Sequence, residues 1–212
     1  MKKLFICFTF LYFNLLLIKA QEFSGAINFK YATVYDTTLN VYYVKNQVVR
    51  LDQFARKKNI VEGSFIFNLK SNEVQCINPK RKLWAAQKNA SPQIIKGECI
   101  VTKGHKTKII ADLKCTEYIV KNTEEDLMIS YWIAHTNFNF FSSLINLWNR
   151  KDKQSVYFRT IKGLEIGCMP MLSEEKQISS GKSISKLEVT KISLVIPKEI
   201  SLKIPSDFSK FE

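Results

Sequence analysis

The sequence is poor in residues that interrupt regular structure and in the residue that most often carries acid–base chemistry. Seven glycines and five prolines stand among 212 residues, and histidine occurs only twice. With so little glycine, the turns must rely on Asn, Asp, Lys and Ser. Neither His105 nor His135 has a second histidine or a cysteine close to it in sequence, which disfavours a metal site built from a short local motif.

Two common motifs of catalysis and phosphate binding are also missing. No Gly-x-Ser-x-Gly occurs. The stretch Ser180–Ser183 has the end of a phosphate loop, but Lys176 stands where its first glycine is required. We expect His105 to lie in a solvated basic turn and His135 to be a structural residue at a strand end. These observations predict a protein that is not an enzyme, with no catalytic residues, metal or cofactor.

Only one long apolar run is present, and it lies at the N-terminus. Met1–Lys3 is basic, Leu4–Ile18 is almost wholly apolar, and Ala20 is a small residue suited to the last position before cleavage. This order is typical of a secretory signal peptide. The alternative, a membrane anchor, is disfavoured because a span needs ~20 apolar residues. We therefore expect residues 1–20 to be removed and 21–212 to form a single domain that is soluble or peripheral.

Positive charge dominates, with 32 Lys and Arg against 19 Asp and Glu and a formal net charge of +13. Outside the cytosol, nucleic acid is not an available partner for such a chain. The basic clusters fall on predicted turns or helix ends, where they form either a solvated surface or a face for anionic envelope head groups. They are Arg56–Lys58, Lys80–Lys82, Lys103–Lys108 and Arg150–Lys153.

Four cysteines remain after removal of the signal peptide. They are Cys76, Cys99, Cys115 and Cys168. An even number in an oxidising compartment favours at least one disulfide, and Cys99–Cys115 is the most local candidate. Four small buried apolar side chains are the alternative. No C-x-x-C pair occurs, which disfavours a thioredoxin-like or zinc-ribbon site.

Apolar and polar residues alternate repeatedly along the mature chain. The alternating segments are Ile27–Tyr31, Leu39–Tyr43, Phe65–Leu69, Leu127–Ile133, Val156–Phe158, Leu187–Val189 and Ile192–Ile196. A period of two, rich in β-branched and aromatic residues, is typical of half-buried strands. Short turns between them indicate an antiparallel meander of about ten strands. We expect Ile200–Ile204 to form a last short strand and Phe208 to tuck against the body.

One segment has helical spacing instead. Apolar residues recur at i, i+3 and i+4 between Phe138 and Trp148, and Thr136 or Asn137 is a suitable N-cap. The basic residues of Asn149–Lys151 suit the negative end of the helix dipole. More than half of the helix circumference is apolar, which exceeds the single stripe needed to lie on a sheet. The excess predicts a ligand, a partner or a second buried surface.

Seven segments spread over nearly the whole mature chain have a recognisable order. They are Gly25–Phe29, Val41–Asp52, Phe65–Asn68, Asn78–Trp84, Lys114–Tyr118, Tyr131–Ala134 and Ile204–Phe208. This order resembles an uncharacterised family of exported bacterial proteins that is similar to the LolA/LolB lipoprotein carriers. The resemblance implies a mainly β fold, a single curved antiparallel sheet forming an unclosed barrel, with one helix packed over its concave face.

The resemblance also implies a cavity under the helix, which in the carriers holds acyl chains. Residues expected to line it, or else to be plain core, are Phe29, Tyr43, Trp84, Trp132, Phe141, Leu144 and Trp148. We expect a non-enzymatic cell-envelope protein that binds a lipid, an acyl chain or a lipoprotein. Its expected location is the periplasm, the outer-membrane periphery or the extracellular space. The alternative is an interaction or structural protein with a packed interior and no small ligand.

Overall fold

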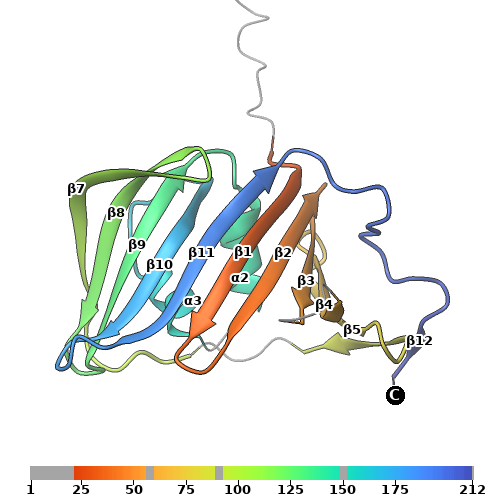
Figure 1. Cartoon of the computed structure of the whole chain (residues 1–212), viewed down its shortest axis with the longest axis horizontal. Coiled ribbons are helices and arrows are strands. Elements are labelled where there is room, and N and C mark those ends of the chain that lie inside the picture. The colour runs from red at the N-terminus through yellow and green to blue at the C-terminus, as the bar shows by residue number, and fades with distance from the viewer. Residues whose placement is uncertain (1–21, 56–59, 89–92, 149–151, 212) are drawn as a thin grey trace, which may run out of the picture.

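A computed structural model describes residues 22–55, 60–88, 93–148 and 152–211, in which twelve strands form one sheet and two helices pack against it (Figure 1). The strands are β1 (Gly25–Thr33), β2 (Thr37–Lys45), β3 (Val48–Phe54), β4 (Val61–Asn68), β5 (Glu73–Asn78), β6 (Leu83–Gln87), β7 (Ile100–Ile110), β8 (Leu113–Asn122), β9 (Leu127–His135), β10 (Cys168–Gln177), β11 (Ser183–Ser193) and β12 (Ser209–Lys210). The helices are α2 (Phe140–Trp148) and α3 (Lys153–Phe158).

The sheet consists of two meanders joined at its centre. Strands β1 to β6 run outward in sequence order, the chain then crosses to the far edge, and β7 to β11 return until β11 pairs with β1. All of these pairs are antiparallel, whereas β12 adds to β6 in parallel. The two edges, β7 and β12, do not pair with each other, so the predicted unclosed curved sheet is confirmed.

The sequence predicted one helix, and the described residues contain two. Helix α2 begins at Phe140, later than the predicted start, and its basic flank at 149–151 lies outside the described residues. The segment Val156–Phe158, predicted to be a strand, belongs to α3. The strand prediction rested on two apolar residues separated by one, a pattern too short to exclude a helix. Val156, Tyr157 and Phe158 are all buried by this turn of helix.

Two further expectations are wrong. The basic segment Lys103–Lys108, with His105, lies within the long strand β7 and not in a turn. Ile200–Ile204 forms no strand, and the last strand is β12, further along the chain. Ile200 and Leu202 instead pack on the outer face of the sheet. No helix among the described residues is long and apolar enough to cross a membrane.

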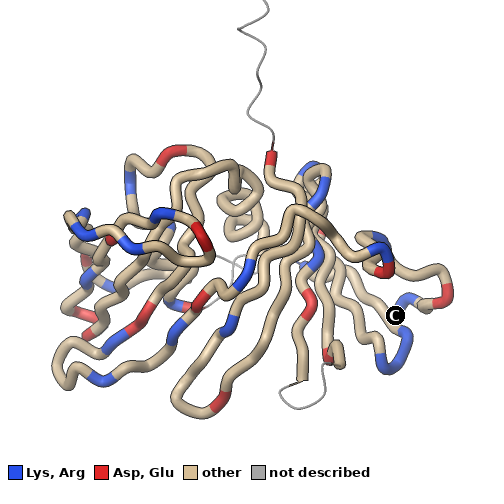
Figure 2. Tube along the Cα trace, turned by 45° about the horizontal axis from the view of Figure 1, so that its top comes forward, with Lys and Arg blue, Asp and Glu red and all other residues tan. Residues whose placement is uncertain are grey.

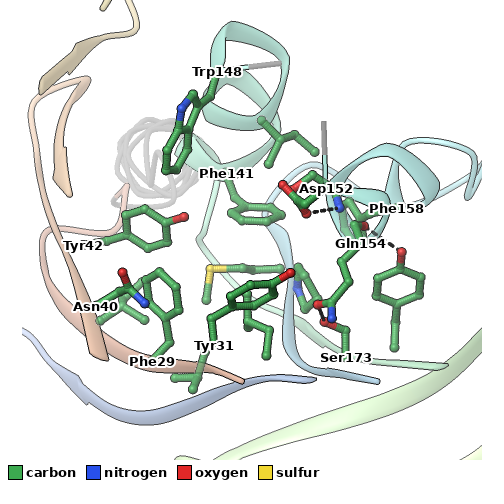
Figure 3. A pocket seen from close by; sticks show the side chains of 18 of the residues that line it. Phe29, Tyr31, Asn40, Tyr42, Phe141, Trp148, Asp152, Gln154, Phe158 and Ser173 are labelled. Carbon is green, nitrogen blue, oxygen red and sulfur yellow. Dashed lines mark hydrogen bonds between the residues drawn. The ribbon is translucent and has the colours of Figure 1, made fainter. Parts of the chain in front are cut away.

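Both faces of the central strands are covered. The helices lie on the concave face, over the two largest clusters of buried apolar residues (Figures 1 and 3). On the outer face, Val41 and Tyr43 lie beneath Ile196, Ile200 and Leu202 of the segment that leads to β12. The alternation predicted for β2 is therefore correct in period, but its most apolar side faces outward, toward the C-terminal segment.

Candidate functional site

A small cavity lies between the concave face of the sheet and the two helices (Figure 3). Its floor includes one row of residues that crosses five neighbouring strands in register: Thr38, Tyr31, Leu187, Ser173 and Tyr131. The antiparallel pairing places all five side chains on the same face. The cavity has a volume of about 70 Å³.

Three of the residues predicted to line a cavity do so: Phe29 from β1 and Phe141 and Trp148 from α2. The ring of Trp148 also packs on Phe67, with centroids 4.9 Å apart. Phe141 meets Phe158 of α3 edge to face at 5.5 Å. These aromatic contacts form the roof of the cavity and connect α2 to both the sheet and α3.

The other four predicted residues do not line this cavity. Tyr43 is buried on the outer face, and Trp132 alternates with the cavity residue Tyr131 and therefore lies on the opposite side of β9. Trp84 lies on β6, where the Nζ of Lys210 stands 5.7 Å from its ring centroid. Leu144, on α2, is fully buried in the core between this helix and the sheet. An aromatic residue in a strand faces the cavity only if the strand's register places it there, which composition does not reveal.

Sequence reasoning missed the polar part of the lining. Asn40 and Gln53 contribute amides from β2 and β3, and Gln154 contributes one from α3. Tyr31 shares the alternation of Phe29 and was accessible from the sequence. Asn40 was not, because a buried amide on a strand that also has an apolar face looks like a solvent-facing residue. The lining is thus aromatic and aliphatic on one side and amide- and hydroxyl-bearing on the other.

A buried hydrogen-bond network fixes α3 to the sheet beside the cavity. Nε2 of Gln154 donates to Oγ of Ser185 at 2.7 Å, and Oγ of Ser173 donates to Oε1 of Gln154. The Ser185 hydroxyl donates to Oε2 of Glu175 at 2.7 Å, and the hydroxyl of Tyr131 donates to the carbonyl oxygen of Gln154 at 2.7 Å. Burial raises the pKa of Glu175 and raises the pKa of Tyr131 well above its ordinary value.

A second polar anchor of α3 centres on Glu125, in the turn between β8 and β9. Its Oε2 forms an ion pair with Nζ of Lys153 at 2.6 Å and accepts a short hydrogen bond from the hydroxyl of Tyr157. Its Oε1 accepts a hydrogen bond from the backbone amide of Lys96 at 3.0 Å. Burial alone would raise the pKa of Glu125, but these hydrogen bonds outweigh it and lower the pKa from 4.5 to about 2.

The two histidines lie in different surroundings. His105 is exposed on β7. His135, exposed at the end of β9, has its Nδ1 3.2 Å from the Sγ of Cys168. Burial raises the pKa of the Cys168 thiol, whereas a nucleophilic cysteine requires a lowered pKa. Among the described residues, no group of three or more His, Cys, Asp or Glu side chains is placed to hold a metal ion.

The predicted disulfide is not present, because all four cysteines are unbridged. The Sγ of Cys99 lies 3.7 Å from Nδ2 of Asn122, at one end of β8, whereas Cys115 lies near the other end of that strand. Seven residues of strand at ~3.3 Å each separate those two ends by roughly 23 Å, far beyond the reach of a disulfide. Cys115 and Cys168 are buried, as the alternative interpretation expects, whereas Cys76 and Cys99 are only half-buried.

The sequence matches no known family profile, and no curated protein is similar to it. Three solved structures show a distant likeness in fold. An uncharacterised conserved protein from Thermus thermophilus has 10% identity and a TM-score of 0.49, over 89% of this chain and 90% of that one. PNGF-II has 11% identity and a TM-score of 0.41, over 82% of this chain and 28% of that one. A LolA superfamily protein from Nitrosomonas europaea has 12% identity and a TM-score of 0.33, over 90% and 92%.

Proposed function

We propose that this chain is an exported, non-enzymatic envelope protein that binds an apolar or lipid-like ligand between the concave face and helix α2. The observation that carries the proposal is the aromatic roof over a mixed floor. Phe141 and Trp148 stand over Phe29, with the amide of Asn40 beside it. Pockets for small ligands are mostly apolar, with a few polar groups that fix the ligand's orientation.

The present volume requires the site to open. A cavity of about 70 Å³ is well below the ~300 Å³ at the lower end of ligand pockets. Helix α2 is the element to move, because it rests on the sheet through apolar side chains, and apolar packing is non-directional. The same small volume favours the second candidate, an interaction protein of the envelope with a packed interior and no ligand.

Native mass spectrometry and lipid extraction of the protein purified from its own envelope separate the two candidates. A bound apolar mass supports the carrier. In vitro, the neutral dye N-phenyl-1-naphthylamine should bind the mature protein. Replacing Trp148 with Ala should raise the dye affinity by about fivefold or more, because truncation of the roof enlarges the cavity.

The matched control is Leu202→Ala, which truncates an apolar side chain on the outer face and should leave dye affinity unchanged. If neither dye nor lipid binds the wild-type protein, the carrier is contradicted and the interaction protein stands. Export is tested separately: the mass of the secreted chain should place its N-terminus at Gln21, whereas a chain that retains Leu4–Ile18 would contradict it.

A further inference from the structure

The two edges of the sheet are treated differently. At one edge, the C-terminal segment lies along β6, where the amide of Ser209 donates to the carbonyl oxygen of Lys82 at 3.0 Å and the amide of Phe211 donates to that of Trp84 at 2.7 Å. The chain therefore covers this edge with an extended segment of its own. At the other edge, β7 is paired only with β8 among the described strands (Figure 1).

Strand β7 is long and exposed for an edge strand. It has 11 residues, of which only Ile110 is buried. Ile100 and Ile109 have 59% and 64% of their surface accessible. Proteins usually protect open edges by keeping them short, charged or bulged, because unpaired backbone groups attract other strands. β7 has a bulge between Lys103 and Thr107 and several lysines, but it keeps its length and its exposed isoleucines.

The charge of β7 determines which strand fits it. The strand contains Lys103, His105, Lys106 and Lys108 and no acidic residue. Lys103 and Lys108 lie over the rings of Tyr118 and Trp132, each with its Nζ 5.8 Å from the ring centroid. A second copy of β7 would bring like charges together, which disfavours pairing. The same lysines attract a strand that carries carboxylates.

We propose that β7 is a docking edge for an extended acidic segment of a partner protein, which adds to the sheet as a further strand. Backbone hydrogen bonds would supply the pairing, as in other cases of strand addition, and the lysines would select for acidic side chains. An anionic lipid surface would complement the lysine charges, but it would not provide a strand to pair with the backbone groups of the β7 edge. The lysines of β7 and those of the Lys80–Lys82 turn lie toward opposite ends of the sheet, so these two clusters do not form one basic face (Figure 2).

Three synthetic peptides of about twelve residues, long enough to lie along β7, test the proposal on the mature protein. In the first, Glu alternates with Val or Thr. The second has the same charge but Pro at every second position, so it offers fewer backbone donors. In the third, Lys replaces Glu. The first should bind about tenfold or more tightly than either of the others, and it should slow hydrogen exchange of the β7 amides.

Charge reversal locates the site. The triple variant Lys103→Glu, Lys106→Glu, Lys108→Glu should weaken binding of the first peptide by about tenfold or more. The matched control reverses Lys45, Lys70 and Lys80, which are exposed on the other half of the sheet, and should retain binding within about twofold. If the β7 triple variant does not fold, Lys106→Glu alone, in the bulge, should weaken binding in the same direction.

Three outcomes would overturn the proposal. Equal binding of the two acidic peptides would show that charge alone is recognised. Exchange protection at β6 or around the cavity, with none at β7, would place the site elsewhere. Binding to anionic phosphatidylglycerol vesicles, together with no protection of β7 by the first peptide, would assign the lysines to a membrane surface.

Discussion

The two helices that border the cavity differ in how far polar contacts add to the apolar packing that holds each of them to the sheet. Helix α2 rests on apolar side chains, with Leu144 fully buried and Phe140 and Leu147 beside it. Helix α3 also packs through apolar side chains, those of Val156 and Phe158, but it has directional polar contacts in addition. The hydroxyl of Tyr131 donates to the Gln154 carbonyl, and Glu125 binds two side chains of the helix. Both sides of the cavity are thus packed, and the α3 side is hydrogen-bonded as well.

This difference determines which helix is able to move. Apolar packing is non-directional, so a helix that rests on it shifts by exchanging one set of contacts for a similar set. A buried polar network loses its hydrogen bonds in any other position and leaves buried groups unpaired. We therefore expect α2 to be the mobile wall and α3 the fixed wall. Single substitutions can weaken each wall separately.

The largest effect is expected where the apolar wall is deepest. Replacing Leu144 with Ala should lower the free energy of unfolding by about 3 kcal/mol or more, because a fully buried leucine leaves a cavity that relaxes only in part. Urea denaturation measures it. Ser143→Ala is the control, since Ser143 is exposed on the same helix and its loss should change little. A loss below about 1 kcal/mol for Leu144→Ala would contradict tight packing of α2.

The polar wall should respond next most strongly. Gln154→Ala should lower the free energy of unfolding by about 2 kcal/mol, because the buried hydroxyl of Ser173 loses its acceptor and that of Ser185 loses its donor. In a double-mutant cycle with Ser173→Ala, the two losses should be less than additive, because both substitutions remove the same hydrogen bond. Additive losses would show that the two side chains do not interact.

The same contrast explains how much of the structure the sequence predicts. The apolar spacing of α2 and the alternation of most strands are local patterns that the structure contains, whereas Val156–Phe158 is helical and β11 ends at Ser193, inside the predicted segment Ile192–Ile196. The anchors of α3 come from Glu125, Ser173 and Ser185, which are distant in sequence from Gln154 and individually resemble solvent-exposed residues. The sequence therefore predicts α2, which has a local apolar pattern, and misses α3, whose polar anchors come from distant residues.

The candidate site follows the same logic. Phe29, Phe141 and Trp148 were predicted because large aromatic residues in regular elements are typical of a cavity or a core. Tyr43 and Trp132 satisfy that criterion equally well, but their registers place them away from the cavity. Which face of a strand a helix covers depends on tertiary packing, because a shift of one residue exchanges the two faces. Tertiary packing likewise determines which polar side chains line the cavity.

The smallest expected loss of stability depends on pH, and this dependence distinguishes α3 from α2. Tyr157→Phe should lower the free energy of unfolding by about 1.5 kcal/mol at pH 7, because it removes a hydrogen bond to the ionised Glu125. Hydrogen bonds hold the folded pKa of Glu125 at about 2, below its ordinary 4.5. Its contribution is therefore complete above about pH 4.5 and is lost as the pH falls toward 2.

In Tyr157→Phe the folded pKa of Glu125 should rise, so the stabilities of wild type and variant should converge between about pH 5 and pH 2. Glu125→Gln is the control: without the carboxylate, its own stability should vary less with pH over this range. Leu144→Ala should keep a constant deficit relative to the wild type, because no ionisable group is removed from the apolar wall. Urea midpoints measured across this pH range test the prediction. If the stability difference between Tyr157→Phe and the wild type did not change with pH, the proposed anchoring of α3 by Glu125 would be contradicted.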